Sequence, residues 1–413
     1  MKIRWFLYTK GNIMLSKQQL QTLAHGKPLY IYDKKVLEAH CTRLKEIFSD
    51  FTILFSIKAN PFVPLVTIMR ENGLGSDSAS KEEVKLSLEA GFNKDLIYYS
   101  TPGKKKTDIE AVLDSCTIIA DSIHELKLIN TVAREHQTKL GIGIRVNPHF
   151  GMMGGKGSVS KFGIDSAQLE QIDDLMKDLP YLTIQGIHIH LRSQVLDAHI
   201  LGTYYKHCFD LAKNLEKHPS IEMKYINFGG GIGTVYHEKT EKPLNWDILT
   251  RILDDIKKDN KNTINAQLIV ESGRFLTAQA GTFYTPIVDI KESQGTHFLV
   301  VENGLNGFLR PSIAHLIQTI AGNERAGYEP LYTGNDAFTI SLVSQGNADK
   351  QRIKQKVTVV GSLCTSLDVI KDNVLLPKAQ IGDYIAVSNA GSYGYSLSPL
   401  GFASHEKPSQ IVR

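Results

Sequence analysis

The chain has 413 residues, of which 42% are hydrophobic and 22% charged, a balance typical of a globular protein long enough for two domains. Its formal net charge of +4 is too small for this length to favour a nucleic-acid-binding protein. The four cysteines lie far apart without a CxxC pair, so we predict neither a zinc site nor a disulfide framework, and we expect a cytoplasmic location. No apolar run approaches the ~20 residues of a membrane span, and the N-terminus lacks the apolar core of a signal peptide. Met14 is a second candidate start.

Eight short β-rich runs recur along the first two thirds of the chain. They occupy residues 52–57, 74–77, 97–100, 117–120, 141–146, 184–191, 225–228 and 268–271. The segments between them, such as residues 81–89 and 124–135, carry helix-forming residues at helical spacing. Because strand–helix alternation implies parallel strands, eight such units predict an α/β protein built on a (β/α)8 TIM-type barrel.

After the eighth run the pattern changes to strands without long helices between them. These runs occupy residues 283–290, 298–301, 339–343, 357–360 and 384–387, and turn glycines separate them. We therefore predict a barrel over residues 36–280 and an antiparallel β-sandwich or β-barrel domain over residues 281–413. The short run at residues 29–32 precedes the barrel, so residues 1–35 are expected to contribute to the β domain.

Glycines follow the seventh predicted strand, where barrel enzymes often bind a phosphate. The strand runs into Gly229, Gly230 and Gly231, whose backbone can approach an anion closely and direct N–H groups at it. The eighth strand leads to Arg274, whose guanidinium suits bidentate contact with the same phosphate. We therefore predict a phosphate site. A dinucleotide fingerprint requires G-x-G-x-x-G, which this stretch lacks, and a tight turn without a ligand is the other alternative.

Three more side chains at predicted strand ends suit an aldehyde cofactor with a phosphate tail. Lys58 ends the first strand, where burial favours the neutral amine that forms a Schiff base; the alternative is a lysine that extends to solvent. Glu271 is placed to keep a pyridine ring protonated, or else pairs with Arg274 as a structural ion pair. His190 lies on the same side of its strand as His188 and suits stacking on the ring. A two-histidine metal site is the alternative, but no third ligand is obvious.

Together these residues resemble the fold-type III pyridoxal-phosphate (PLP) decarboxylases, the family of diaminopimelate and eukaryotic-type ornithine decarboxylases. The similarity covers about residues 25–405. It is carried by the motifs F-S-I-K-A-N, D-S-A-S-K-E-E, S-K-F-G, H-I-H-L-R-S-Q, F-G-G-G-I-G, E-S-G-R-F, G-S-L-C-T-S-L-D and N-A-G-S-Y-G. The resemblance implies a PLP cofactor, decarboxylation of a small-molecule amino acid, and a homodimer with shared active sites.

The resemblance also implies a role for each matching residue. Lys58 corresponds to the Schiff-base lysine, and Cys364, supplied by the partner subunit, corresponds to the cysteine that returns a proton after carbon dioxide leaves. His190, the third residue implied in catalysis, stacks on the cofactor ring, while Glu271 pairs with the ring nitrogen. The remaining residues near the cofactor or its phosphate are Asp77, Ser193, Gly229, Gly230, Gly231, Arg274 and Tyr393.

The chain departs from the family where the distal end of the substrate binds. The residue after the cysteine is glutamate in diaminopimelate decarboxylases and aspartate in ornithine decarboxylases, where it binds a distal ammonium. Here it is Thr365, whose neutral hydroxyl cannot compensate a buried cation, and Asp368 is a candidate substitute. Arg310 resembles an arginine that contacts a distal carboxylate, and Ala314 replaces a tyrosine and widens the pocket. The alternative for Arg310 is a structural carboxylate partner.

These features most resemble the siderophore-biosynthesis branch, which decarboxylates N-citryl diamino acids such as citryl-ornithine or citryl-diaminopropionate. Decarboxylases of diaminopimelate, of ornithine or lysine, and of carrier-bound glutamate are the alternatives. A non-catalytic homologue is a remote alternative, because Lys58, Glu271, Arg274 and Cys364 are all present. We expect no metal, no nucleic acid and no membrane among its partners.

Overall fold

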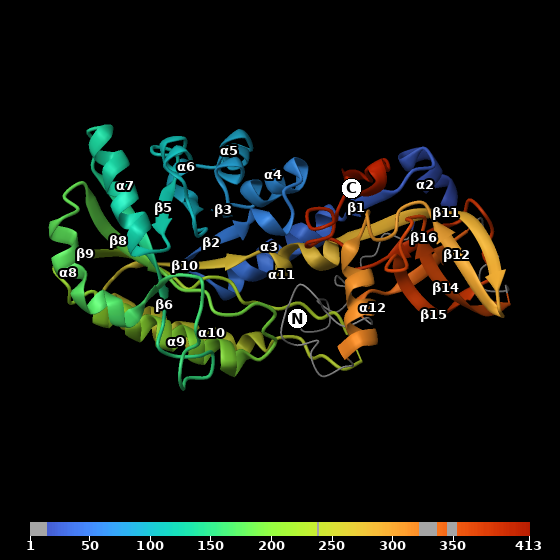
Figure 1. The fold of residues 1–413 in the computed structure, drawn as a ribbon. Coiled ribbons are helices and arrows are strands. Elements are labelled where there is room, and N and C mark those ends of the chain that lie inside the picture. The colour runs from blue at the N-terminus through green and yellow to red at the C-terminus, as the bar shows by residue number, and fades with distance from the viewer. Residues whose placement is uncertain (1–14, 238, 322–336, 345–352) are drawn as a thin grey trace. The chain divides into compact units, whose positions relative to one another are not determined.

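The chain forms two compact units in a computed structural model, shown in Figure 1. The structure describes residues 15–237, 239–321, 337–344 and 353–413. Among these residues, the barrel unit comprises those within 40–233 and 242–273, and the β unit comprises the others. These boundaries differ from the expected ones, chiefly because residues 234–241 belong to the β unit. Met14 and the N-terminal stretch compared with a signal peptide lie outside the described residues.

Eight parallel strands close into a barrel in the barrel unit. In chain order they are β2 (Phe51–Ser56), β3 (Gly75–Ser78), β4 (Ile97–Tyr99), β5 (Thr117–Ala120), β6 (Leu140–Asn147), β8 (Leu182–His188), β9 (Ile221–Asn227) and β10 (Gln267–Ser272). Pairing of β10 with β2 and of β5 with β6 completes the ring, and the short β7 (Ile164–Asp165) adds to β6. The predicted (β/α)8 barrel is therefore confirmed.

Helices alternate with these strands along the chain (Figure 1). They are α3 (Lys34–Ile47), α4 (Val63–Glu71), α5 (Lys81–Glu89), α6 (Lys106–Glu110), α7 (Ile123–Glu135), α8 (Ile172–Lys177), α9 (Ala198–Leu215) and α10 (Trp246–Asn262). Side chains of Ser80, Ser122, Asp197 and Asn245 accept backbone N–H groups and so begin α5, α7, α9 and α10. Inside the barrel, the Tyr225 ring occupies space that a Cβ atom at Gly186 would fill.

The β unit holds a mixed sheet. Its strands are β1 (Leu29–Tyr32), β11 (Gly281–Ser293), β12 (Thr296–Val301), β13 (Ile340–Val343), β14 (Lys354–Gly361), β15 (Val369–Pro377), β16 (Tyr384–Val387) and β17 (Ser409–Val412). A separate β domain is confirmed. Two pairings, β1 with β17 and β12 with β14, are parallel, so the expectation of a purely antiparallel sheet is corrected. Strand β1 also pairs with β11, which attaches the N-terminal segment to this unit.

The two longest helices that lie wholly within the described part of the β unit were not expected. The helix α12 (Leu309–Ala321) occupies a stretch where we predicted no long helix; Pro311 lies in its first turn, where a missing N–H costs nothing. The helix α2 (Lys17–Ala24) begins with a capping box between Ser16 and Gln19, and its apolar side packs in a core with Tyr284.

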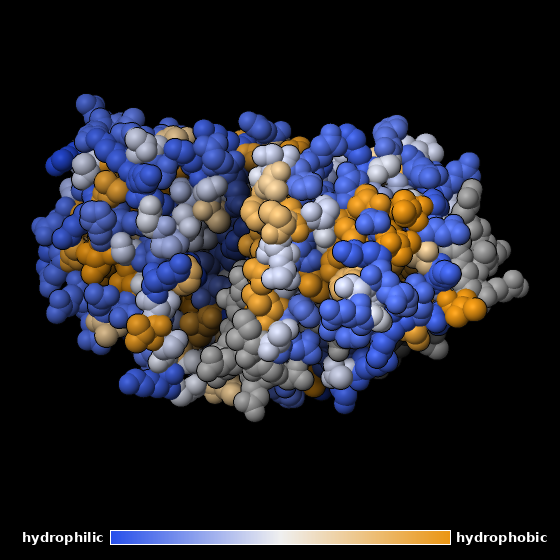
Figure 2. All heavy atoms as spheres, turned by 45° about the vertical axis from the view of Figure 1, so that its right-hand side comes forward, coloured by the Kyte–Doolittle hydropathy of each residue, from blue (hydrophilic) through white to orange (hydrophobic). Residues whose placement is uncertain are grey.

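Hydrophilic side chains predominate on the face that Figure 2 shows, and smaller apolar patches interrupt them. Within the described part of the chain, no helix is both long enough and apolar enough to cross a membrane. All four cysteines are free thiols.

Candidate functional site

The predicted residues of the barrel unit lie at the carboxyl ends of its strands, the edge at which barrel enzymes carry chemistry. Asp77 lies in β3 and Glu271 in β10. Lys58 lies after β2 in the 3-10 helix η1 (Ile57–Ala59), and His190 lies two residues beyond β8, so neither ends its strand as expected. Strand β2 ends before Lys58 because the Asn60 N–H donates to the Ile57 carbonyl, a hydrogen bond of the 3-10 type that turns the chain.

Lys58 forms an ion pair with Asp77. The Lys58 Nζ atom lies 2.9 Å from Asp77 Oδ2, and the Ser100 hydroxyl donates to Asp77 Oδ1 at 2.8 Å. The Asp77 side chain is fully buried, whereas 45% of the Lys58 side chain is exposed. The expected burial of Lys58 is therefore corrected, because a partly exposed amine meets a buried carboxylate, while its role as the Schiff-base lysine stays a prediction. The pair directs the amine toward the strand ends.

Glu83 is a second carboxyl group near this pair that the sequence analysis did not single out. Its Oε2 atom accepts from the Ala79 N–H at 2.6 Å. Burial raises the pKa of Glu83 to about 7, and the negative charge of Asp77 acts in the same direction. Glu83 can therefore exchange a proton near neutral pH. Its place in the D-S-A-S-K-E-E motif was the available signal.

Glu271 lies at the centre of a buried network. Its Oε1 atom accepts from Asn227 Nδ2 at 2.8 Å and lies 3.3 Å from His188 Nε2. Burial opposes ionisation of Glu271, but attraction to His188, Lys58 and His190 outweighs burial and holds the pKa of Glu271 well below its usual range. An ionised carboxylate in this position can keep a pyridine nitrogen protonated.

Asn227, which the sequence analysis missed, connects Glu271 to the glycine turn. Its side chain is fully buried, and its Oδ1 atom accepts from the Gly229 N–H at 2.8 Å while Nδ2 donates to Glu271. Because each end of the amide has a partner of the opposite kind, the orientation of the amide is fixed. The only signal in the sequence was its position just before the predicted phosphate turn.

The turn formed by Gly229, Gly230 and Gly231, the glycine turn, requires glycine, but it offers fewer free backbone N–H groups to an anion than predicted. Gly229 and Gly231 have φ angles of 67° and 140°, and a Cβ atom at Gly229 would collide with the Ile189 carbonyl. The Gly229 N–H is bound to Asn227, and the Gly230 N–H donates to His190 Nδ1 at 3.0 Å. Of the three, only the Gly231 N–H lacks a partner among the described residues, so it alone remains to meet an anion.

His190 carries a neutral imidazole. Since its Nδ1 atom accepts a backbone N–H, its proton belongs on Nε2. Burial lowers the pKa of His190 to about 4, against the attraction of Glu271. A neutral ring suits stacking, and Nδ1 is not open to a metal; the described residues contain no group of three metal-ligating side chains. Ser193 lies three residues after His190, on a segment that a hydrogen bond joins to the glycine turn. In this bond the Val195 N–H donates to the Gly231 carbonyl at 2.8 Å.

In the β unit, two arginines share one tyrosine. Arg274 begins α11 (Arg274–Thr277), and Arg310 is the second residue of α12. Tyr236 Oη accepts from Arg274 Nη1 at 3.1 Å and from Arg310 Nη1 at 3.4 Å. Arg310 is fully buried and also donates to the Ser392 carbonyl at 2.9 Å, and the Tyr393 ring lies 5.2 Å from Arg274 Cζ. We call Tyr236, Arg274 and Arg310 the arginine cluster; Tyr236 was not predicted.

The loop between β14 and β15 carries the other predicted residues. Cys364 is exposed and Thr365 is half-buried. Asp368 is buried, and its two oxygens accept from the N–H groups of Leu305 at 2.6 Å and Leu363 at 3.0 Å. Asp368 therefore holds the loop through both of its oxygens, and its binding of a distal ammonium stays a prediction.

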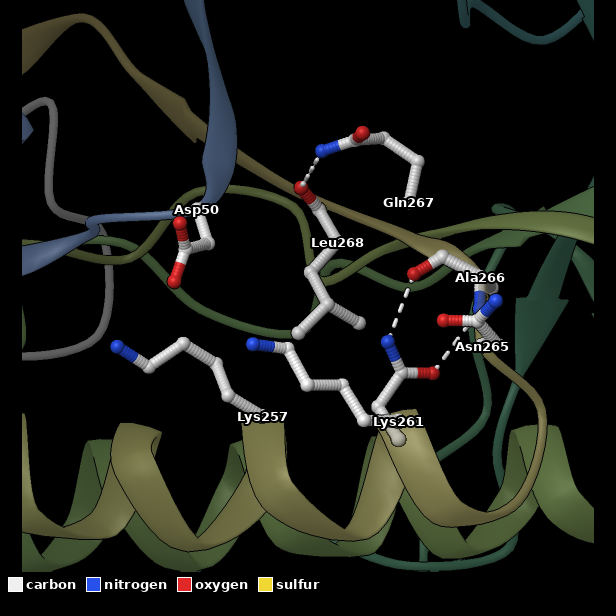
Figure 3. A pocket seen from close by; sticks show the side chains of 8 residues that line it. Asp50, Lys257, Lys261, Asn265, Ala266, Gln267 and Leu268 are labelled. Carbon is white, nitrogen blue, oxygen red and sulfur yellow. Dashed lines mark hydrogen bonds between the residues drawn. The ribbon is translucent and has the colours of Figure 1, made fainter.

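A separate pocket lies at the amino ends of the barrel strands (Figure 3). It is lined by Asp50, Lys257, Asn260, Lys261, Asn265, Ala266, Gln267 and Leu268, none of which is a predicted site residue. The Asn260 amide bridges α10 to the start of β10 by donating to the Ala266 carbonyl at 2.7 Å. Residues at this end of a barrel serve stability, so we place no chemistry here.

Comparison with known proteins gives consistent matches over most of the chain. Residues 34–278 match the family described as pyridoxal-dependent decarboxylase, pyridoxal binding domain. An L-glutamyl-BtrI acyl-carrier protein decarboxylase of Niallia circulans is 31% identical over 395 residues, covering 94% of this chain and 88% of that protein. A diaminopimelate decarboxylase of Aquifex aeolicus is 29% identical over 401 residues, covering 95% and 88%. The crystal structure of diaminopimelate decarboxylase from Helicobacter pylori complexed with L-lysine has a TM-score of 0.79 at 25% identity, covering 96% and 94%.

Proposed function

This chain belongs to the pyridoxal-dependent decarboxylases, and we propose that it removes the α-carboxyl group of an amino acid with a carboxylate-rich distal end. The substrate we propose is an N-citryl diamino acid, citryl-ornithine or citryl-diaminopropionate, in the biosynthesis of a carboxylate siderophore. The family membership makes the chain an enzyme with a PLP cofactor. The choice of substrate rests on the charges of the arginine cluster and on the neutral Thr365 side chain.

The barrel unit fits the cofactor. Lys58 offers an amine for the aldehyde, ionised Glu271 suits the ring nitrogen, and the turn with the open Gly231 N–H suits a phosphate. When bound, PLP supplies an electron sink for the electron pair that remains as carbon dioxide leaves. Glu271 would hold a proton at the ring nitrogen, and the neutral His190 imidazole would stack on the ring.

The observation that carries the substrate proposal is the charge of the arginine cluster. It places two buried guanidinium groups around a single phenol. Two buried cations side by side repel each other, and an incoming carboxylate lowers that repulsion, whereas a distal ammonium adds a third positive charge. Thr365 is neutral, and Asp368 is used by its own loop. Both features favour a substrate that ends in carboxylates.

Carrier-bound glutamate is a second candidate. The supporting observation is the 31% identity to the Niallia circulans decarboxylase named for such a substrate. A glutamyl group joined to a carrier also lacks a distal ammonium, so Thr365 suits it equally. Other relatives of this chain are named diaminopimelate decarboxylases. Diaminopimelate ends in both a carboxylate and an ammonium, and only the carboxylate suits Arg310.

We also propose that the enzyme is a cytoplasmic homodimer. Cys364 is exposed on its loop. A residue that completes the active site of the partner subunit has to be exposed before the dimer assembles. In that role it donates a proton to the α-carbon after carbon dioxide leaves. The four free thiols suit a reducing compartment.

Turnover of individual substrates tests this function. The PLP-loaded enzyme is offered citryl-ornithine, carrier-bound glutamate, meso-diaminopimelate and ornithine separately, and carbon dioxide release is measured. We expect citryl-ornithine to be turned over fastest; faster turnover of either free diamino acid overturns the substrate proposal. The control is Lys58→Ala, which should lose both turnover and the absorbance band of bound cofactor near the visible edge. An unchanged band in that variant contradicts the assignment of Lys58.

A further inference from the structure

The hydrogen-bond ladder between β8 and β9 breaks where the chain enters the glycine turn. Just beyond the two strands, the Ile189 N–H donates to the Asn227 carbonyl at 2.9 Å, as in a regular parallel ladder. The next bond of that ladder would run from the Gly229 N–H to the Ile189 carbonyl. Instead, the Gly229 N–H donates to the side chain of Asn227 at 2.8 Å. The Ile189 carbonyl therefore loses its ladder partner.

The ladder between β9 and β10 shifts at the same point. The Phe228 N–H donates to the Ile269 carbonyl at 3.0 Å, so the regular pattern would next join the Glu271 N–H to the Phe228 carbonyl. The Glu271 N–H donates to the Gly229 carbonyl instead, at 2.9 Å. This slip of one residue coincides with the φ angle of 67° at Gly229. The Phe228 carbonyl therefore loses its ladder partner as well.

The hydroxyl of Tyr204 meets both of these carbonyls. Tyr204 lies on α9 and donates to the Ile189 carbonyl at 2.7 Å and to the Phe228 carbonyl at 3.0 Å. A phenol carries a single proton, so the two carbonyls share it. Burial raises the pKa of Tyr204 well above its usual value, and the hydroxyl therefore keeps this proton.

Burial makes this shared bond important for the conformation of the turn. Tyr204, Ile189 and Phe228 are almost fully buried, and neither carbonyl accepts a backbone N–H among the described residues. A buried carbonyl without a donor is costly. Without the hydroxyl, the carbonyls would compete for the ladder N–H groups of Gly229 and Glu271. Regaining these bonds would release Gly229 from Asn227 and undo the bend at the start of the glycine turn.

We propose that Tyr204 is a positioning residue, whose hydroxyl holds the glycine turn in the bent conformation that receives the phosphate of the cofactor. The inference rests on the proposed function, which assigns the phosphate to this turn. Tyr204 acts through the carbonyls of Ile189 and Phe228, which directly precede His190 and Gly229 in the chain.

The test compares Tyr204→Phe with Tyr205→Phe. The control loses an equally buried hydroxyl on the same helix, one that has no hydrogen-bond partner among the described residues. PLP and pyridoxal, which lacks the phosphate, are titrated into each cofactor-free protein, and the absorbance of the bound aldehyde gives the affinities. We expect Tyr204→Phe to weaken PLP binding about tenfold and pyridoxal binding less than about twofold, while Tyr205→Phe keeps both affinities.

Three results of this titration overturn the proposal. They are unchanged PLP binding in Tyr204→Phe, equal losses of PLP and pyridoxal in that variant, and an equal loss of PLP binding in Tyr205→Phe. An equal loss of both aldehydes would show that the hydroxyl only stabilises the barrel, because the phosphate is the sole difference between the two ligands.

A measurement on the wild type decides the question if Tyr204→Phe does not fold. Nuclear magnetic resonance of tyrosine-labelled protein follows the exchange of the Tyr204 hydroxyl proton with solvent, with and without PLP. Coupling between two events is reciprocal, so a hydroxyl that favours the bent turn is held more tightly when the cofactor occupies it. We expect PLP to slow this exchange about tenfold and pyridoxal to slow it less. An unchanged rate, or equal slowing by both aldehydes, overturns the proposal.

Failure of the proposed function gives different results. If no citryl substrate is turned over but PLP binding depends on Tyr204, the substrate proposal fails and the role of Tyr204 stands. If the wild type binds pyridoxal as tightly as PLP, the assignment of the phosphate to the glycine turn fails, and the role of Tyr204 fails with it.

Discussion

Replacing Asn227 with alanine tests the link between Glu271 and the glycine turn. The change removes a 2.8 Å bond to an ionised carboxylate, which contributes about 1.5–3 kcal/mol, and leaves the Gly229 N–H without its partner at a cost of about 1–3 kcal/mol. Because both groups are buried, we expect the free energy of unfolding to fall by about 3–5 kcal/mol in total. Glu271 also loses a donor that favours its ionised form, so its pKa should rise.

Asn260→Ala is the matched control at the other end of the barrel. Asn260 is a buried asparagine whose amide also makes two bonds, both with the backbone of Ala266. Its loss involves no charged partner and should cost about 1–3 kcal/mol. Denaturant unfolding at neutral pH measures both variants in the cofactor-free protein.

Cofactor affinity separates the two asparagines. We expect Asn227→Ala to weaken PLP binding at least about tenfold, since 1.4 kcal/mol of lost positioning suffices for that factor. Asn260→Ala should bind PLP as the wild type does. Wild-type affinity in Asn227→Ala, or an equal loss in both variants, would refute the reasoning that Asn227 positions Glu271 and the turn.

Three further predictions concern Glu83, Asp368 and Thr365. The pKa of Glu83 is raised from 4.5 to about 7, so its contribution to stability is complete below pH 4.5 and is lost as pH rises through 7. Urea unfolding of the cofactor-free proteins measures the free energy of unfolding of Glu83→Gln relative to the wild type. This difference should rise in favour of the variant by about 2–3 kcal/mol from pH 5 to pH 8, and a difference that does not change with pH contradicts the raised pKa of Glu83. Asp368→Asn should lower stability by about 1–3 kcal/mol without changing substrate preference, and a changed preference would restore Asp368 to the substrate site. Thr365→Glu should improve relative turnover of meso-diaminopimelate about tenfold, and no shift would show that position 365 does not contact the distal end.

The barrel could be predicted from sequence because each strand and helix carries its own local pattern. Lys58 and His190 were misplaced by one or two residues, since hydrogen bonds of the local turns, rather than hydropathy, decide where the strands end. The helix α12 was missed because its apolar spacing was not distinguished from that of the surrounding strands.

The partners of the site residues could not be predicted, because they come from distant parts of the chain. The structural role of Asp368 could not be predicted, since its Oδ1 atom accepts from the N–H group of Leu305, 63 residues earlier. Tyr236 had no local signal, because its role depends on arginines 38 and 74 residues later in the chain. Sequence motifs identified groups with reactive side chains, while their burial and hydrogen bonds required the fold.

A competition between two substrates tests the central claim most directly. The PLP-loaded wild-type enzyme receives equal concentrations of citryl-ornithine and meso-diaminopimelate, each labelled in the α-carboxyl group, and the label released as carbon dioxide gives the ratio of kcat/KM values. We predict a ratio of at least about ten in favour of citryl-ornithine, because the arginine cluster offers two cations and Thr365 a neutral hydroxyl to the distal end. A ratio that favours meso-diaminopimelate would contradict the account.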